Sequence, residues 1–172
     1  MTIDSNANFR QQAHVENEDK SQLNKKEVQA QKYDLNYIHL GGNIGCLVNG
    51  AGLAMSTMDI IKIYGGSPAN FLDVGGSANG EAMTEAVKLL NTDDEVKAIF
   101  VNIFGGILKC DVLTQSILNA AKQIGLKKPM VLRLKGTNSD KAKQMIAGKE
   151  KDLGIYYEED FDTAARKVCN MV

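Results

Sequence analysis

The fold is indicated first by the segment Gly45-Cys46-Leu47-Val48-Asn49-Gly50-Ala51-Gly52. Its apolar half has the length and composition of a strand that is buried on both faces. Apolar residues then recur at three- and four-residue steps over residues 53–63, which is typical of a helix packed on one side. The segment therefore predicts one strand–turn–helix unit of a parallel sheet.

The same unit recurs along the chain. Predicted strands span residues 44–48, 70–74, 98–103, 130–134 and 154–156. Predicted helices span residues 53–63, 81–90, 107–124, 139–147 and 161–168. We therefore expect an α/β domain with a parallel five-stranded sheet and helices on both faces, either Rossmann-like or flavodoxin-like.

Residues 11–31 differ from the rest in composition, because they are rich in Gln, Asn, Lys and Glu and nearly empty of large apolar side chains. Such a stretch does not build a core. We expect a solvated connector or surface excursion there, with a loose helix over residues 25–31.

Composition excludes several classes of partner. The chain has 172 residues, of which 44% are apolar, enough for one core, and its formal net charge is −1. It has no excess of Lys or Arg for a nucleic acid or an anionic membrane, and no apolar run approaches the roughly 20 residues that cross a bilayer. The three cysteines, Cys46, Cys110 and Cys169, are far apart and predict neither a disulfide framework nor a metal site. We expect no nucleic-acid partner, no membrane partner and a reducing compartment.

Four glycine-rich loops follow the first four predicted strands, at residues 49–52, 75–80, 105–106 and 135–138. The carboxyl ends of parallel strands meet at one edge of the sheet, where ligands bind in such folds. Glycine lets a ligand approach the backbone, and the helix that follows offers free N–H groups and a partial positive charge. The pattern predicts an anion site at this edge. A simpler interpretation, in which each glycine only tightens a turn, stays open for any single loop.

A dinucleotide site is the rival interpretation, since Gly50-Ala51-Gly52 follows a strand and Asp73 ends the next one. The third glycine of that motif would fall at Met55, whose side chain we expect to obstruct helix–strand packing. The sequence contains no GxSxG and no HExxH motif. His14 and His39 are interpreted as surface or packing residues.

The glycine-rich segments resemble those of succinate–CoA ligase β subunits, and the resemblance covers nearly the whole chain. The similar stretches are residues 45–55, 58–61, 68–76 and 101–107. Residues 4–11 resemble the end of the nucleotide-binding module of that family. The resemblance implies that residues 1–40 are a remnant of an ATP-grasp module and a polar connector, and that residues 41–172 form a CoA-ligase-type α/β domain.

The resemblance also implies a reaction in which an NTP phosphorylates a histidine of an α subunit, succinyl phosphate forms, and CoA displaces the phosphate. No catalytic residue is then expected in this chain, which should be inactive alone. Mg²⁺, ATP or GTP, and CoA belong to the complete enzyme, and this chain alone should hold no cofactor or metal. The expected partner is the α subunit, in a heterodimer or heterotetramer, with succinate and phosphate at the interface.

The substrate-contact positions that the resemblance implies are Asn49, Gly106, Ile107 and Leu108. Asn49 can offer its side-chain amide to a carboxylate, and the other three can offer backbone N–H groups at a helix start. Further loop contacts are expected at Gly50, Gly52 and Gly105.

Two residues depart from the family pattern. Ser77 stands where a third glycine is common, and Lys135 stands where an RLEGTN-like segment has Glu, whereas Arg133 and Asn138 match. Residues 45–49 and 58–62 are similar to mitochondrial-type sequences, which implies the mitochondrial matrix, with the bacterial cytoplasm as the alternative. The alternative function is a stand-alone nucleotide- or acyl-CoA-binding module of the same fold.

Overall fold

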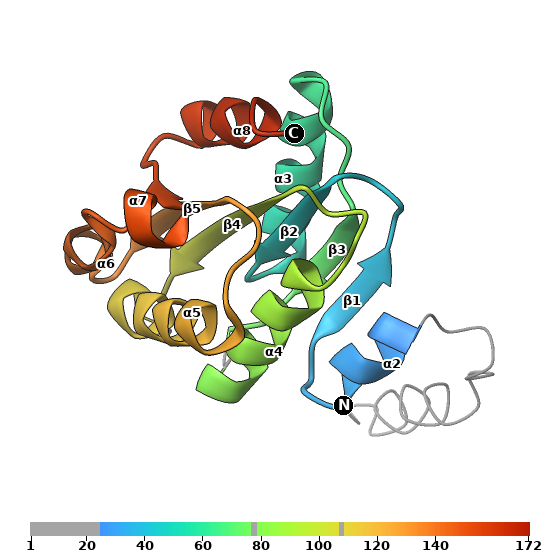
Figure 1. Ribbon diagram of the computed structural model, residues 1–172, viewed down its shortest axis with the longest axis horizontal. Coiled ribbons are helices and arrows are strands. Elements are labelled where there is room, and N and C mark those ends of the chain that lie inside the picture. Colours follow the sequence, from blue (N-terminus) through green and yellow to red (C-terminus); the bar gives the residue numbers. More distant parts are fainter. Residues whose placement is uncertain (1–24, 77–78, 107–108) are drawn as a thin grey trace, which may run out of the picture.

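The computed structural model describes residues 25–76, 79–106 and 109–172, which form a six-stranded sheet between two layers of helices (Figure 1). The strands are β1 (Asn36–His39), β2 (Ile44–Val48), β3 (Asn70–Asp73), β4 (Ala98–Gly105), β5 (Met130–Gly136) and β6 (Ile155–Tyr157). Their order is β1-β3-β2-β4-β5-β6. Strands β2 to β6 run parallel, and β1 pairs antiparallel with β3 at one edge.

Helices cover both faces of the sheet. They are α2 (Lys25–Gln31), α3 (Ala51–Ile63), α4 (Gly80–Asn91), α5 (Cys110–Ile124), α6 (Ser139–Ile146), α7 (Glu150–Leu153) and α8 (Phe161–Cys169). Helices α3 and α8 pack on one face, and α2, α4, α5 and α6 pack on the other (Figure 1). Within the described ranges, no helix is both long enough and apolar enough to cross a membrane.

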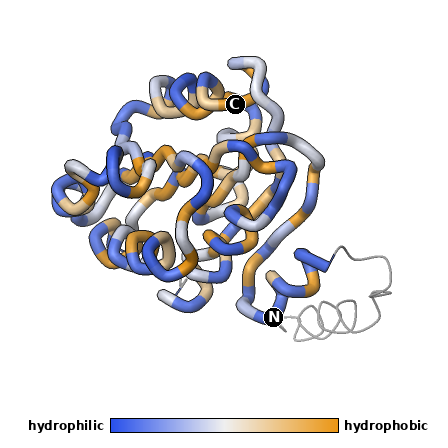
Figure 2. The backbone as a smooth tube through the Cα atoms, viewed as in Figure 1, coloured by the Kyte–Doolittle hydropathy of each residue, from blue (hydrophilic) through white to orange (hydrophobic). Residues whose placement is uncertain are grey.

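The central strands are buried because helices cover them on two sides. All five residues of β2 are buried, and Figure 2 shows the hydrophobic stretches that run through the middle of the molecule. Successive side chains of a strand point to opposite faces. Phe100 therefore joins the core beneath α3 and α8, while its neighbour Val101 joins the core beneath α4 and α5.

The α/β class, the five parallel strands and the helices on both faces are confirmed. The five parallel strands have the flavodoxin-like order. We expected five strands, but the sheet has six, because β1 was not predicted. Strand β1 has only four residues and no continuous apolar run. The short helix α7 was also not predicted. The helix predicted over residues 107–124 was expected to start too early, since the observed helix α5 begins at Cys110.

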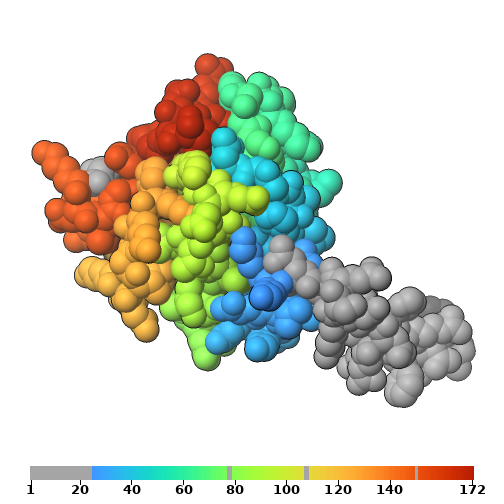
Figure 3. All heavy atoms as spheres, turned by 45° about the vertical axis from the view of Figure 1, so that its right-hand side comes forward, coloured from blue at the N-terminus to red at the C-terminus, as the bar shows by residue number. Residues whose placement is uncertain are grey.

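The helix predicted over residues 25–31 is confirmed with the same bounds, but it is not a solvated connector. Ala30 is fully buried, and α2 lies against α4 (Figure 3). Leu35 and Tyr37, which follow α2, belong to the same core. Residues 25–39, which fall in the range assigned to a remnant module and connector, thus help to cover this domain. His14 lies outside the described residues.

Candidate functional site

The loops at the carboxyl ends of β3, β2, β4 and β5 lie side by side. We call this edge the rim, and it comprises residues 49–50, 74–76, 79, 105–106, 109 and 136–138 among those described. The chain leaves β2 through α3 toward β3 on one side, and it returns through α4 to β4 on the other side. The end of β2 beside β4 is therefore a topological switch point, the place where open α/β sheets bind ligands.

Asn49 and Phe104 meet at the switch point. The Asn49 Nδ2 group donates to the carbonyl of Phe104, and the Phe104 N–H donates to Asn49 Oδ1, each over 2.8 Å. The side chain thus extends the pairing of β2 with β4 beyond Val48. An amide nitrogen carries two N–H groups, and the contact with Phe104 uses one of them. Asn49 is held in place with a donor left for a ligand.

Asp73 connects the loops that follow β2 and β3 through hydrogen bonds. Its Oδ1 atom accepts hydrogen bonds from the N–H of Gly50, over 2.6 Å, and from the N–H of Gly75, over 2.8 Å. Asp73 is 8% exposed. A carboxylate that accepts two backbone N–H groups holds both turns, as an aspartate that caps a loop does. This contact argues against a ribose-binding role for Asp73.

The start of α3 lies at the rim. Gly50 precedes the helix with a φ of 110°, a conformation that L side chains rarely adopt, and no side chain caps the helix there. Gly52, in the first turn, has open space where a Cβ would lie. Met55 is 55% exposed, so our expectation that its side chain would obstruct helix–strand packing is wrong.

The loops after β4 and β5 are joined to each other. The Thr137 N–H donates to the Gly105 carbonyl over 2.8 Å, and the Cys110 N–H donates to the Thr137 carbonyl over 2.9 Å. Gly136 has a φ of 101°, and a Cβ there would lie 2.1 Å from the Gly105 oxygen. Only glycine fits this position. The approach of Gly136 to Gly105 was not predicted, because the two residues are adjacent only through the register of β4 with β5.

Gly106 is exposed, and a Cβ there would meet no atom of the described residues within 4 Å. Ile107 and Leu108 lie outside the described residues. Because α5 begins at Cys110, Gly106 belongs to the loop before the helix and not to its first turn. The Cys110 N–H is bonded to Thr137, and the N–H of Val112 is bonded to Asp111 Oδ1, so the first turn has fewer free donors than we expected.

Asp111 also connects the loops after β4 and β5. Its Oδ2 atom accepts a hydrogen bond from Asn138 Nδ2 over 3.0 Å. This bond is the main cause that lowers the pKa of Asp111. Asp111 therefore positions Asn138, whose φ of 63° places it in the left-handed region just before α6.

Lys135 forms an ion pair with Glu159, which lies after β6. The hydrogen bond from Lys135 holds the pKa of Glu159 below its ordinary value. The lysine that departs from the family pattern therefore has a partner within the domain. Ser77, the other departure, lies outside the described residues.

Arg133 is half-buried beneath the rim and belongs to a row of hydrogen-bonded polar side chains. Its Nη1 group donates to Asn102 Oδ1 over 3.0 Å, and Asn102 Nδ2 lies 2.8 Å from Thr57 Oγ1. The guanidinium also lies 5.3 Å from the ring centre of Phe161. These contacts tie β5 and β4 to α3 and α8.

A protein-family model described as CoA-ligase matches residues 47–169 of this chain. This match covers most of the described sheet and all of the rim, and the chain belongs to the CoA-ligase family.

Among solved structures, ATP citrate lyase from Methanothrix soehngenii in complex with citrate and coenzyme A aligns with a TM-score of 0.66 at 16% identity, over 80% of this chain and 39% of that chain. PH0766 from Pyrococcus horikoshii aligns with a TM-score of 0.63 at 18% identity, over 87% of this chain and 39% of that chain. At these identities the likeness concerns the fold alone.

Succinate–CoA ligase β subunits are much more similar in sequence. The chain is 54% identical over 172 residues to the ADP-forming β subunit of Bacillus subtilis, covering all of this chain and 44% of that protein. It is 57% identical over 167 residues to the mitochondrial ADP-forming β subunit of Oryza sativa, covering 97% of this chain and 39% of that protein. It is 54% identical over 170 residues to the mitochondrial GDP-forming β subunit of Dictyostelium discoideum, covering 99% of this chain and 40% of that protein. The chain thus spans less than half the length of these relatives.

Proposed function

We propose that this chain is the carboxy-terminal part of the β subunit of a succinate–CoA ligase. In this role it contributes its rim to a succinate and phosphate site at the interface with an α subunit, for the interconversion of succinyl-CoA and succinate with NTP formation in the citric acid cycle. The observation that carries the proposal is the 54% identity along all 172 residues to a β subunit of that name. Mg²⁺, ATP or GTP, and CoA are assigned to the complete enzyme.

The geometry of the switch point supports the substrate part of the proposal. Asn49 is fixed by Phe104 and keeps a donor for a carboxylate, and hydrogen bonds to charged groups are the stronger ones. Gly106 lies on the neighbouring loop without a side chain, so that an anion can approach its backbone. Phe104, 59% exposed, presents an apolar ring beside them. We assign succinate and phosphate contacts to Asn49, Gly106, Ile107 and Leu108, with Gly50, Gly52 and Gly105 as further loop contacts.

The proposal places the histidine that accepts phosphate in the α subunit, so His39 of this chain is expected to lie away from the rim. His39 ends β1 opposite Asn70, the first residue of β3, so it lies at the amino ends of the parallel strands and away from the rim. Its Nε2 atom lies 3.2 Å from Glu95 Oε2. A histidine engaged there is not aimed at a ligand on the rim.

For the compartment we propose the mitochondrial matrix. The support is the 57% identity with the mitochondrial β subunit of Oryza sativa. The bacterial cytoplasm is the alternative, because the Bacillus relative has nearly the same identity.

The proposal is tested by mixing the purified chain with succinate, CoA, Mg²⁺ and ATP or GTP, with and without a matching α subunit. We expect the isolated chain to form no succinyl-CoA and to co-purify with the α subunit. Turnover by the pure chain would contradict the proposal. Tight binding of CoA or nucleotide by the chain alone, without α-subunit binding, would instead favour a stand-alone binding module.

A further inference from the structure

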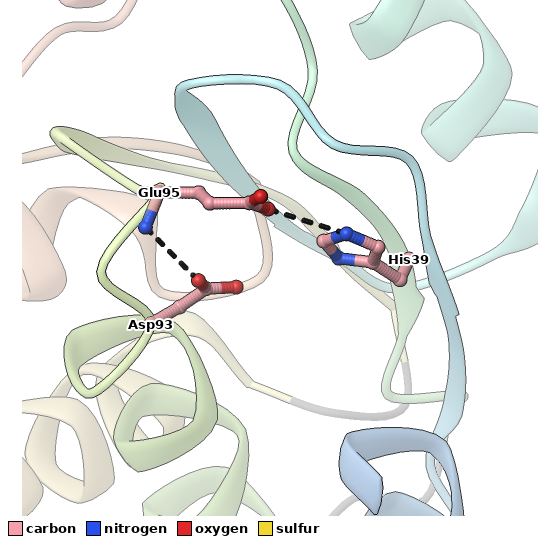
Figure 4. A group of neighbouring side chains, drawn as sticks. All are labelled: His39, Asp93 and Glu95. Atoms are coloured by element: carbon pink, nitrogen blue, oxygen red, sulfur yellow. Dashed lines mark hydrogen bonds and ion pairs between the residues drawn. The ribbon is translucent and has the colours of Figure 1, made fainter. Parts of the chain in front are cut away.

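A group of titratable side chains lies at the edge of the sheet opposite the rim. It consists of His39, at the end of β1, and of Asp93 and Glu95, in the loop between α4 and β4 (Figure 4). The loop enters β4 at Ala98, and His39 pairs with the first residue of β3, so all three lie at the amino ends of the parallel strands. None of the three belongs to the residues proposed for the ligase site.

The three side chains converge. One ligand atom from each lies within 4.8 Å of the others. The Glu95 Oε2 atom is 3.2 Å from His39 Nε2, and Asp93 Oδ1 accepts the backbone N–H of Glu95 over 3.1 Å. This last bond fixes the loop so that both carboxylates face the imidazole (Figure 4).

A buried hydroxyl next to this group lacks a partner. Tyr37 and His39 are two residues apart in β1 and therefore face the same side of the strand. Tyr37 is 6% exposed, and within the described ranges its hydroxyl makes no hydrogen bond. Burial raises the pKa of Tyr37, and the negative charges of Asp93, Glu27 and Glu95 raise it further. The buried His39 Nδ1 atom likewise has no hydrogen-bond partner among the residues that the structure describes.

Two lysines contact Asp93, whereas Glu95 and His39 are partly exposed. Lys26 Nζ lies 2.6 Å from Asp93 Oδ2, and Lys128 Nζ donates to the Asp93 backbone carbonyl. Although burial raises it, the pKa of Asp93 is held below its ordinary value, mainly by the bond with Lys26. The Glu95 side chain is 52% exposed and the His39 side chain 27%, so one side of the group faces solvent.

We propose that His39, Asp93 and Glu95 bind a divalent transition-metal cation of the Zn²⁺ class. Imidazole nitrogen and carboxylate oxygen are both ligand types that Zn²⁺ accepts, and water from the open side completes four-coordination. Mg²⁺ and Ca²⁺ prefer oxygen ligands alone and are expected to bind weakly. The bound cation joins β1 to the loop before β4 and shares the Asp93 carboxylate with Lys26.

The experiment is a calorimetric titration of the full 172-residue chain with Zn²⁺, and in parallel with Mg²⁺, in reducing buffer. His39→Gln and Glu95→Gln are partly exposed and should fold, and Asp94→Asn, an exposed acid in the same loop, is the matched control. We expect one Zn²⁺ site that is weakened at least about tenfold in both ligand variants and unchanged in Asp94→Asn. Zn²⁺ should also slow amide exchange in β1 of the wild-type chain and of Asp94→Asn, and have no such effect in the two ligand variants.

Equal Zn²⁺ affinity in His39→Gln and in the wild-type chain would overturn the proposal, because the ion would then sit elsewhere, for example on Cys169. Absence of binding at millimolar Zn²⁺ would overturn it too. Neither result bears on the ligase function, which is measured separately through succinyl-CoA formation.

Discussion

The side-chain amide of Asn49 pairs with the backbone of Phe104 through two hydrogen bonds of 2.8 Å, as a further residue of strand β2 would. This pair lies at the switch point, where the strands that follow β2 are added first on one side of it and then on the other. Asn49 therefore stabilises the rim and is also the residue that we propose to contact succinate.

Asn49→Ala should therefore have two effects. Loss of both bonds should lower the free energy of unfolding by about 1–3 kcal/mol, measured by urea denaturation. In the complete enzyme, loss of the remaining donor should raise the KM for succinate or lower kcat/KM, and leave phosphorylation of the α-subunit histidine largely intact. Asn119→Ala, which removes an exposed amide bonded only within α5, is the control and should be nearly neutral. An unchanged succinate response would reduce Asn49 to a structural role.

Gly136→Ala should destabilise the domain by about 2–4 kcal/mol, because the new Cβ would lie 2.1 Å from the Gly105 oxygen on a residue whose φ is 101°. Gly76→Ala is the matched control on the same rim. Its Cβ meets no atom within 4 Å and its φ is not positive, so we expect a change within about 0.5 kcal/mol. Similar midpoints of thermal unfolding for the two variants would contradict this account of the loop.

Gly106→Val should fold normally, because the position is exposed and open in the described structure. If the loop serves the phosphoryl group, the branched side chain should block its approach and abolish phosphoryl transfer in the assembled enzyme. Gly106→Ala should give a smaller loss. The measurement is the rate of histidine phosphorylation in the α subunit, with co-purification and thermal unfolding to confirm assembly. Near-normal rates in Gly106→Val would remove this loop from the phosphate site.

Lys135→Met should raise the pKa of Glu159 toward its ordinary value, because the hydrogen bond and charge of Lys135 hold it down. The pKa of Glu159 is lower in the folded chain, so the ion pair stabilises the fold above the unfolded pKa of about 4.3, and its contribution disappears as the pH falls through the folded value. Carbon-detected NMR titration of Glu159 measures the shift. Lys127→Met is the control, and a Glu159 pKa that is the same in both variants would disprove the pairing.

The sequence was sufficient for the parallel part of the fold, because strands covered on both faces are continuous apolar runs. It was not sufficient for β1, whose four residues alternate between buried and exposed sides and include Asn36 and His39. It also misplaced the start of α5, because the apolar residues after Gly106 fit a helical pattern while the observed first turn begins at Cys110.

The meeting of the glycine-rich loops at one edge was predictable, but the contacts between them were not. Glycines after successive strands indicated the rim correctly, since parallel strands end at a common edge. The partners of Asn49 and Gly136 could not be predicted, because Phe104 and Gly105 are brought to them by the register of neighbouring strands. The two bonds that Asp73 accepts likewise depend on two turns that meet only in the folded sheet.

The hydrogen bonds between neighbouring rim loops also bear on how a partner protein would dock. Asp73 joins the first two loops, Asn49 joins β2 to β4, and Thr137 joins the last two, so the conformational entropy of the residues that make these bonds is already lost when the chain folds. Association with a complementary surface then requires little further ordering. We expect the hydrogen-bonded rim residues to meet such a partner without rearrangement, with an association rate set by diffusion and orientation.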